Sequence, residues 1–123
     1  MATRSRIAIE KLDGTVISVY CHNDGYPDGV GKGLLAKFPN GTDHSVVQDF
    51  IEKGDRSTLS LSYKEWRNEK CPPKNHASVP AFFDGDIEEW GYLYTQEGEW
   101  LIKSSSPIDE PAPLDEVIVE HYS

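Results

Sequence analysis

Residues 6–21 read RIAIEKLDGTVISVYC, and this stretch decides the fold. Apolar side chains occupy alternate positions on both sides of Asp13-Gly14. They are Ile7, Ile9, Ile17, Val19 and Cys21. Alternation of this kind is typical of half-buried β-strands, and Asp-Gly is a strong signal for a two-residue hairpin turn. The sequence therefore predicts an antiparallel hairpin over residues 6–21.

Further strands are predicted in the second half of the chain. A second hairpin spans residues 91–103, because strand-like runs flank Gln96-Glu97-Gly98 and glycine suits a turn position with positive φ. Residues 59–66 alternate apolar and polar side chains and predict another strand. Residues 68–80 predict a proline-rich loop. Short strands are expected at 81–83 and 117–119, and residues 104–113 are expected to form a loose loop.

Two short helices are predicted between the two hairpins. The first spans residues 29–38, and its apolar residues at helical spacing are Val30, Leu34, Leu35 and Phe38. The second spans residues 43–53, and its apolar face is Val46, Val47, Phe50 and Ile51. Asp43 or Ser45 can cap the second helix, Ser45 with Gln48 fits a capping box, and Gly54 can end the helix. A further helical turn is expected over 86–90. The whole chain, residues 1–123, then reads as one α+β domain with a mainly antiparallel sheet.

The composition predicts a folded and acidic protein. With 37% hydrophobic and 11% aromatic residues, the 123-residue chain has enough core-forming side chains to bury a core. The net charge of -9 is concentrated near the end: residues 84–123 hold eleven acidic residues against Lys103 alone. Such a field repels nucleic acids and membrane surfaces and attracts basic partners, although acidic surfaces also serve solubility.

The sequence shows no pattern of a membrane or secreted protein. No apolar run reaches the roughly 20 residues that a membrane helix needs, and the first residues lead directly into a strand pattern. We therefore expect a protein that stays in the cytoplasm, with no membrane contact. A reducing compartment disfavours disulfides, so Cys21 and Cys71 are expected to be free thiols.

The loop after the first hairpin collects residue types that carry chemistry. Residues 21–31 read CHNDGYPDGVG. The phosphate-binding pattern fails at Tyr26 and Gly33, and the dinucleotide pattern fails at Leu34. A calcium loop would lack ligands at Tyr26 and Leu35. The sequence therefore predicts no cofactor.

Zinc and thiol chemistry are also disfavoured. Cys21, His22, Cys71 and His76 are suitable zinc donors, but adjacent strand residues point to opposite faces and the remaining spacing is poor. Cys21 lies on the apolar face of its strand, so we interpret it as a small core residue rather than a nucleophile. We predict no metal site and no catalytic residue.

Two functional alternatives remain for this loop, beside its simplest interpretation as a turn at Asp24-Gly25 and a helix cap at Asp28-Gly29. In the first, the protein binds a small nucleotide-like signal and sequesters it. The residues for that site would be His22, Asp24, Tyr26, Lys32, Trp66 and Arg67. In the second, His22 and Asp24 act as an acid–base pair in a hydrolase.

The first third of the chain resembles a known family. Residues 1–5 (MATRS), Asp13-Gly14, the block 20–31 (YCHNDGYPDGVG) and Leu34-Leu35 look like a family of small, mostly uncharacterised proteins of tailed bacteriophages and some bacterial genomes. The resemblance is strong over residues 1–36, looser through Gly54-Asp55 and residues 63–69, and faint around residues 90–94. Members carry a Cys-His-Trp-Asp-Gly-Tyr block, and this chain has Asn23 in place of the Trp.

The resemblance implies a phage-type accessory protein rather than an enzyme. Such proteins commonly bind a host protein, for instance to blunt a defence system such as CRISPR or to redirect host machinery. An acidic face that imitates nucleic acid is one physical way to do so, and it agrees with the charge distribution. The residues expected to contact a basic host protein are Asp84, Asp86, Glu88, Glu89, Trp90, Tyr92, Glu97, Glu99 and Trp100.

Overall fold

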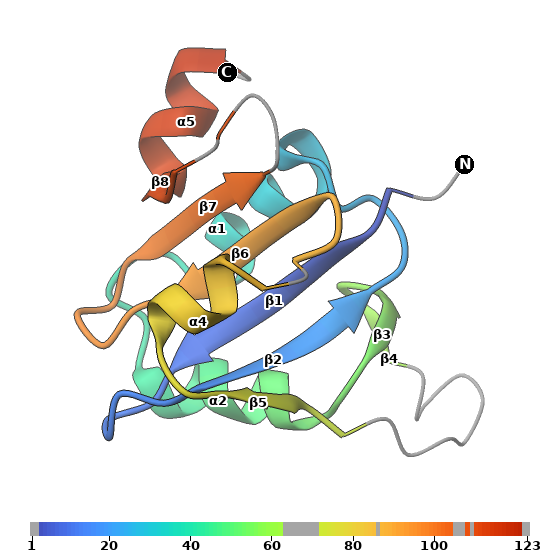
Figure 1. The fold of residues 1–123 in the computed structure, drawn as a ribbon. Helices are drawn as coiled ribbons and strands as arrows, with labels where there is room; N and C mark the ends of the chain where they lie inside the picture. Colours follow the sequence, from blue (N-terminus) through green and yellow to red (C-terminus); the bar gives the residue numbers. More distant parts are fainter. Residues whose placement is uncertain (1–2, 63–71, 86, 105–107, 109, 122–123) are drawn as a thin grey trace.

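The computed structural model describes residues 3–62, 72–85, 87–104, 108 and 110–121. These residues form an α+β fold with one mixed, largely antiparallel sheet, as the sequence predicts. The strand order is β4-β3-β2-β1-β6-β7-β8, and β5 also pairs with β2 (Figure 1). The strands are β1 (Ser5–Glu10), β2 (Val16–Cys21), β3 (Arg56–Thr58), β4 (Leu61–Ser62), β5 (Lys74–His76), β6 (Trp90–Tyr94), β7 (Trp100–Ser104) and β8 (Ala112–Pro113).

The first hairpin is confirmed, with a different turn. β1 and β2 pair antiparallel, with Ile7 opposite Val19 and Ile9 opposite Ile17. The loop is longer than the expected two residues: the Gly14 N–H donates to the Lys11 carbonyl, and the Lys11 N–H donates to the Thr15 carbonyl. Gly14 has φ +87°, so it takes the left-handed position that closes a three-residue hairpin loop.

The second hairpin is confirmed as well. β6 and β7 pair antiparallel, from Trp90 opposite Ser104 to Tyr94 opposite Trp100. Gly98 in the connecting turn has φ +83°, as its position in the sequence predicts. The two hairpins join through a parallel pairing of β1 with β6, which puts Ile7 beside Tyr92. This central parallel pair carries no local signal in the sequence, because its two strands are far apart in the chain.

Both predicted helices are present. A π-helical turn, η1 (Pro27–Gly31), leads into α1 (Lys32–Lys37), and the second helix is α2 (His44–Glu52). Asp43 caps α2 by accepting hydrogen bonds from the Ser45 N–H and hydroxyl, at 2.9 and 2.7 Å. The expected capping box is wrong, because Ser45 lies inside the helix and the Gln48 amide donates to Glu52 instead.

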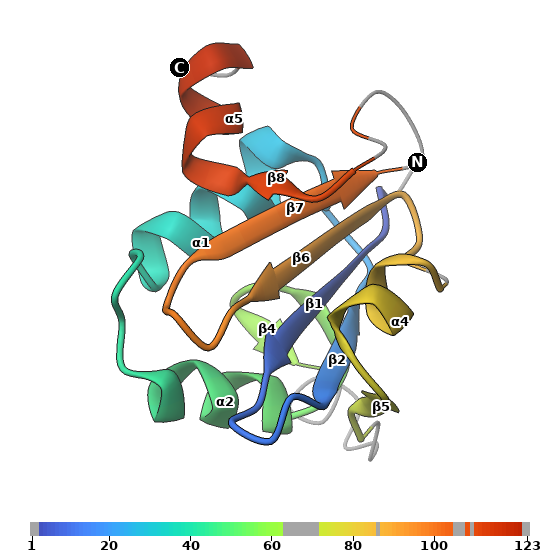
Figure 2. The same cartoon turned by 60° about the vertical axis from the view of Figure 1, so that its left-hand side comes forward.

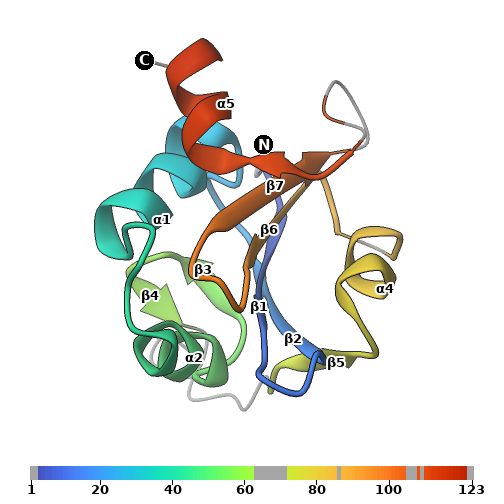
Figure 3. The same ribbon diagram turned by 90° about the vertical axis from the view of Figure 1, so that its left-hand side faces the viewer.

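The helices cover the two faces of the sheet unequally. η1, α1, α2 and α5 (Leu114–His121) lie on one face, and α4 (Val79–Phe83) lies on the other (Figure 3). The larger core contains Ile7 and Ile9 of β1, and the smaller core contains Ala8. All three side chains are fully buried, as expected for a central strand that is covered on both faces.

The predictions from the sequence are wrong for several elements after residue 55. Residues 81–83 belong to α4 rather than to a strand, because the Ser78 hydroxyl caps the helix by accepting from the Ala81 N–H. Residues 117–119 belong to α5 rather than to a strand. Residues 87–90 form no helical turn: Glu88 makes a strand bridge and β6 starts at Trp90.

The remaining predicted segments agree only in part. The strand expected at 59–66 is limited in the described residues to β4, and Leu59 and Ser60 form the turn that joins it to β3. Residues 63–71 lie outside the described residues. Within the expected loop 68–80, residues 74–76 form β5, and within 104–113 Ser104 ends β7 and residues 112–113 form β8. Among the helices of the described residues, none is long and apolar enough to cross a bilayer.

Candidate functional site

The loop of residues 21–31 is fixed to the body of the fold. The Gly25 carbonyl accepts a buried hydrogen bond from the Tyr92 hydroxyl at 2.7 Å, and the Gly25 N–H donates to the Thr3 carbonyl. The Val30 N–H donates to the Asp24 carbonyl at 2.7 Å, which closes the loop onto η1. These contacts leave the loop a defined shape and place Asp24 and Tyr26 at the surface.

A shallow cavity of about 350 Å³ opens between this loop and the β3–β4 turn. We call it the Asp24 cavity, and its lining is Asn23, Asp24, Tyr26, Gly29, Val30, Thr58, Leu59 and Ser60. The Asn23 amide holds the two walls together by donating to the carbonyl and the hydroxyl of Ser57, at 3.1 and 3.0 Å. The cavity therefore has a rigid wall on the side where Asn23 stands.

Asp24 has a strained backbone in this cavity. Its φ is +60°, a left-handed conformation that non-glycine residues rarely adopt. A side chain at Gly29 would meet the Asp24 carbonyl oxygen, so the close approach of the two segments requires glycine there. The Tyr26 hydroxyl lies 3.4 Å from the Asp24 carboxylate, and that negative charge raises the pKa of Tyr26. The cavity therefore presents a carboxylate and a protonated phenol.

Four of the six residues predicted for a ligand site are described, and the structure brings two of these four together. Asp24 and Tyr26 line the cavity, whereas Lys32 pairs with Asp28 one turn away, at 2.6 Å. The His22 Nδ1 lies 2.6 Å from the Tyr20 hydroxyl rather than beside Asp24, so the proposed acid–base pair is not assembled. Trp66 and Arg67 lie outside the described residues.

Cys21 is a core residue, as the sequence predicts. Its side chain is fully buried and free, and burial raises the pKa of the thiol to about 11. A nucleophilic thiolate would require the opposite shift. Cys71 lies outside the described residues.

A polar network on the α4 side of β2 was missed by sequence reasoning. The Ser18 hydroxyl lies 2.7 Å from His76 Nε2 and accepts from Arg6 Nε at 3.0 Å. Burial lowers the pKa of His76, which favours the neutral ring that accepts the Ser18 proton. Ser18 is fully buried in the sheet, so this pair ties β5 to β2 and offers no reachable nucleophile.

The predicted partner surface is wrong for Tyr92 and Trp100. Tyr92 and Trp100 are fully buried in the larger core, and Trp90 is half-buried against it. The Trp100 indole N–H donates to the Phe38 carbonyl at 2.9 Å, which satisfies its polar atom inside the protein. A protein partner therefore cannot contact these two rings while the fold is intact.

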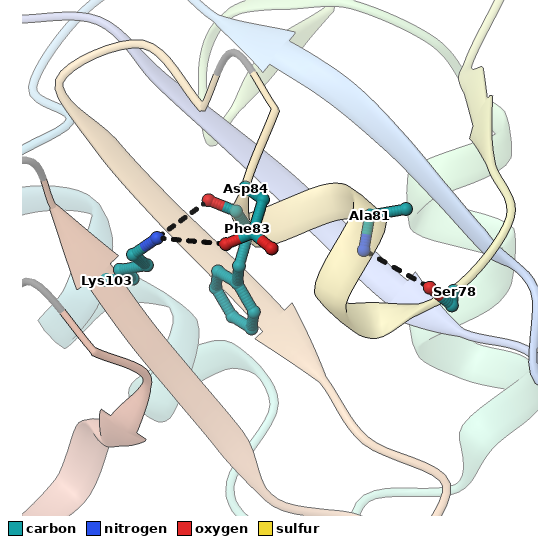
Figure 4. Close-up of polar contacts among 5 residues, drawn as sticks. All are labelled: Ser78, Ala81, Phe83, Asp84 and Lys103. Atoms are coloured by element: carbon teal, nitrogen blue, oxygen red, sulfur yellow. Dashed lines mark hydrogen bonds and ion pairs between the residues drawn. The ribbon is translucent and has the colours of Figure 1, made fainter.

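The predicted acidic residues fall into two groups at opposite ends of the β6–β7 hairpin. Near one end, Asp84 lies 3.7 Å from the Lys103 ammonium, which also donates to the Phe83 carbonyl (Figure 4). Beside it, the Glu89 carboxylate accepts from the Arg4 N–H, and Glu88 is partly exposed. Asp86 lies outside the described residues.

The other acidic group lies at the hairpin turn. Glu97 and Glu99 are exposed there. Leu101 of β7 pairs with Pro113 of β8, and α5, which follows β8, carries Asp115 and Glu116 at exposed positions of its first turn (Figure 2). We call these four residues the acidic edge. Sequence reasoning missed the contribution of α5, although two acids after Pro113 are a typical signal for the first turn of a helix.

Comparison with protein-family models, with curated proteins and with solved structures found no match. The resemblance of residues 1–36 to the phage family therefore stays a prediction.

Proposed function

We propose that this chain is a phage-type accessory protein that binds a basic surface of a host protein in the bacterial cytoplasm and inhibits or redirects it. The acidic edge would be the contact surface, in place of the aromatic residues named from the sequence. The supporting observation is that Glu97 and Glu99 are exposed at the β6–β7 turn, while Asp115 and Glu116 are exposed in the first turn of α5, which follows the strand paired with Leu101 of β7. Imitation of a nucleic-acid backbone by such a surface would direct it to a nucleic-acid-binding host protein, including a component of a defence system.

Electrostatics favours this kind of partner. Residues 84–123 carry eleven acids against one lysine, and in the described residues that lysine lies beside Asp84 at the far end of β7. Lys103, the one lysine or arginine in residues 84–123, therefore lies beside Asp84 and does not neutralise the acidic edge. A concentrated field of one sign accelerates encounter with a surface of the other sign, and salt weakens it.

The test is capture of host proteins from a bacterial lysate at about 0.05 M and about 0.5 M salt, followed by calorimetry with the purified partner. Glu97→Gln with Glu99→Gln is expected to weaken binding about ten-fold or more, because two charges leave the contact surface. Asp49→Asn with Glu52→Gln is the matched control, since it removes two charges from exposed positions on α2. Equal loss in both double variants, or capture that salt does not change, would reject the acidic edge.

The Asp24 cavity supports a second candidate, small-ligand binding. Its lining residues include a carboxylate, a phenol and two hydroxyls, and no lysine, arginine or histidine is among those that belong to the described part of the chain. This set favours a hydroxyl- or amine-bearing ligand over the phosphates of a nucleotide-like signal. A thermal-shift panel of nucleotides, sugars and amines separates these classes, because a specific ligand raises the melting temperature. Loss of the shift in Asp24→Asn would place the ligand in this cavity.

A further inference from the structure

A second cavity, of about 410 Å³, lies on the other side of the β3–β4 turn and has the opposite charge. Leu59 and Ser60 separate it from the Asp24 cavity, because both residues line both cavities. Lys37 of α1, Lys53 after α2 and Arg56 of β3 also line it, and among the lining residues that the structure describes the one acid is Asp49. In a chain of net charge -9, three cations in one hollow are a local reversal of charge.

The floor of this cavity is aromatic. Phe38 and Phe50 pack at 5.1 Å between ring centroids and are almost fully buried. The Lys37 ammonium lies 5.6 Å from the Phe38 ring and 5.9 Å from the Phe50 ring, and the Arg56 guanidinium lies 4.0 Å from the Phe50 ring. Val46 adds an apolar wall that is 48% exposed. The cavity thus offers rings and an aliphatic wall below, with cations around them.

The two lysines are available to a ligand. Within the described residues, neither Lys37 nor Lys53 makes an ion pair, and both are exposed. Arg56 is different, since it is 4% exposed and donates to the Leu59 carbonyl at 2.7 Å, which fixes its position. A fixed guanidinium in the wall with two exposed ammonium groups at the rim is suited to a negatively charged group.

We infer that this cavity binds a small organic anion with a flat, aromatic body, its ring against Val46 and the phenylalanines and its charge beside Lys37 and Lys53. The volume lies in the range of small-ligand sites. The inference does not depend on the proposed protein partner, because the acidic edge and this cavity share no residue. It also differs from the Asp24 cavity, whose carboxylate disfavours an anion.

Three probes test the inference by NMR titration of the ¹⁵N-labelled protein: phenyl phosphate, inorganic phosphate and benzyl alcohol. We expect phenyl phosphate to bind most tightly and to shift the amide signals of Lys37, Phe38, Val46, Phe50 and Lys53. Inorganic phosphate lacks the ring and benzyl alcohol lacks the charge, so each should bind at least about five-fold more weakly. Benzoate in place of phenyl phosphate then tells a carboxylate from a phosphate preference.

Variants locate the anion. Lys53→Gln and Lys37→Gln should each weaken phenyl phosphate binding about five-fold, because each removes one charge from the rim. Lys74→Gln removes an exposed charge from β5 and should leave the affinity unchanged. The inference is overturned if no probe binds, if benzyl alcohol binds as tightly as phenyl phosphate, if the shifts fall elsewhere, or if Lys74→Gln matches the two rim variants. Loss of the host-protein contact in the Glu97/Glu99 variant leaves this result untouched.

Discussion

Single residues tie the loop at 21–31 to the hairpin at the other end of the chain. The clearest is Tyr92, whose hydroxyl donates to the Gly25 carbonyl inside the protein. Tyr92→Phe is expected to lower the free energy of unfolding by about 1–3 kcal/mol, because it leaves a buried carbonyl without this donor. Urea unfolding measures the loss, and NMR should show changed signals in residues 23–30.

Tyr94→Phe is the matched control for that prediction. The Tyr94 hydroxyl donates to the Thr42 carbonyl at 2.6 Å, in a different loop. It should lower stability as well, but it should leave the signals of residues 23–30 in place. Equal disturbance of that loop by both variants would contradict the role given to Tyr92.

The left-handed backbone at Asp24 leads to a second prediction. Glycine adopts φ +60° without strain, whereas alanine does not. Asp24→Gly should therefore be more stable than Asp24→Ala by about 1 kcal/mol in urea unfolding. If the carboxylate serves a ligand, both variants should abolish the thermal shift to the same extent. A ligand that still binds Asp24→Gly would show that the loop shape, and not the carboxylate, matters.

At the scale of elements, His76 makes the attachment of β5 depend on pH. Burial lowers the pKa of His76 from its ordinary value of 6.5, so the unfolded chain binds the proton more readily than the folded one. Stability is therefore expected to fall as the pH drops below 6.5 towards the lower pKa of the folded state. Comparing urea midpoints at about pH 7.5 and about pH 5.5 measures the effect.

The comparison needs a variant, because other groups also titrate in this range. His76→Gln keeps an acceptor for Ser18 and removes the titration. We expect its midpoint to fall less between the two pH values than that of the unaltered protein. A parallel fall in both proteins would mean that His76 does not control the pH dependence.

The elements that the sequence predicted correctly are those with local signals. Both hairpins carry glycine at a left-handed turn position, and α2 carries its cap Asp43 and its stop Gly54. The helix α5 was misread because the run Val117-Ile118-Val119 favours a strand by propensity. Packing decides otherwise: Leu114 and Val117 are buried, and a side chain at Gly31 would meet Leu114 and Ile118.

At the scale of the whole molecule, surface and cavity residues were the least predictable. The alternation of residues along β6 and β7 does not show which side chains are buried, because helices cover the sheet on both faces; the burial of Tyr92 and Trp100 was therefore not predicted. Both side chains can be buried there because the polar atom of each donates a hydrogen bond to a backbone carbonyl. The cationic cavity had no sequence signal at all, since Lys37, Lys53 and Arg56 come from three separate segments.

The parallel pairing of β1 with β6 also sets the order in which this protein can be assembled. Ser5 pairs with Trp90, so the centre of the sheet joins residues 85 positions apart. Contacts of such long range slow folding, because a large loop must close before they form. On the ribosome, the first hairpin is made early but keeps one edge of β1 open until β6 emerges. Until then, β1, which lies at the centre of the finished sheet, is an edge strand with which other chains can pair.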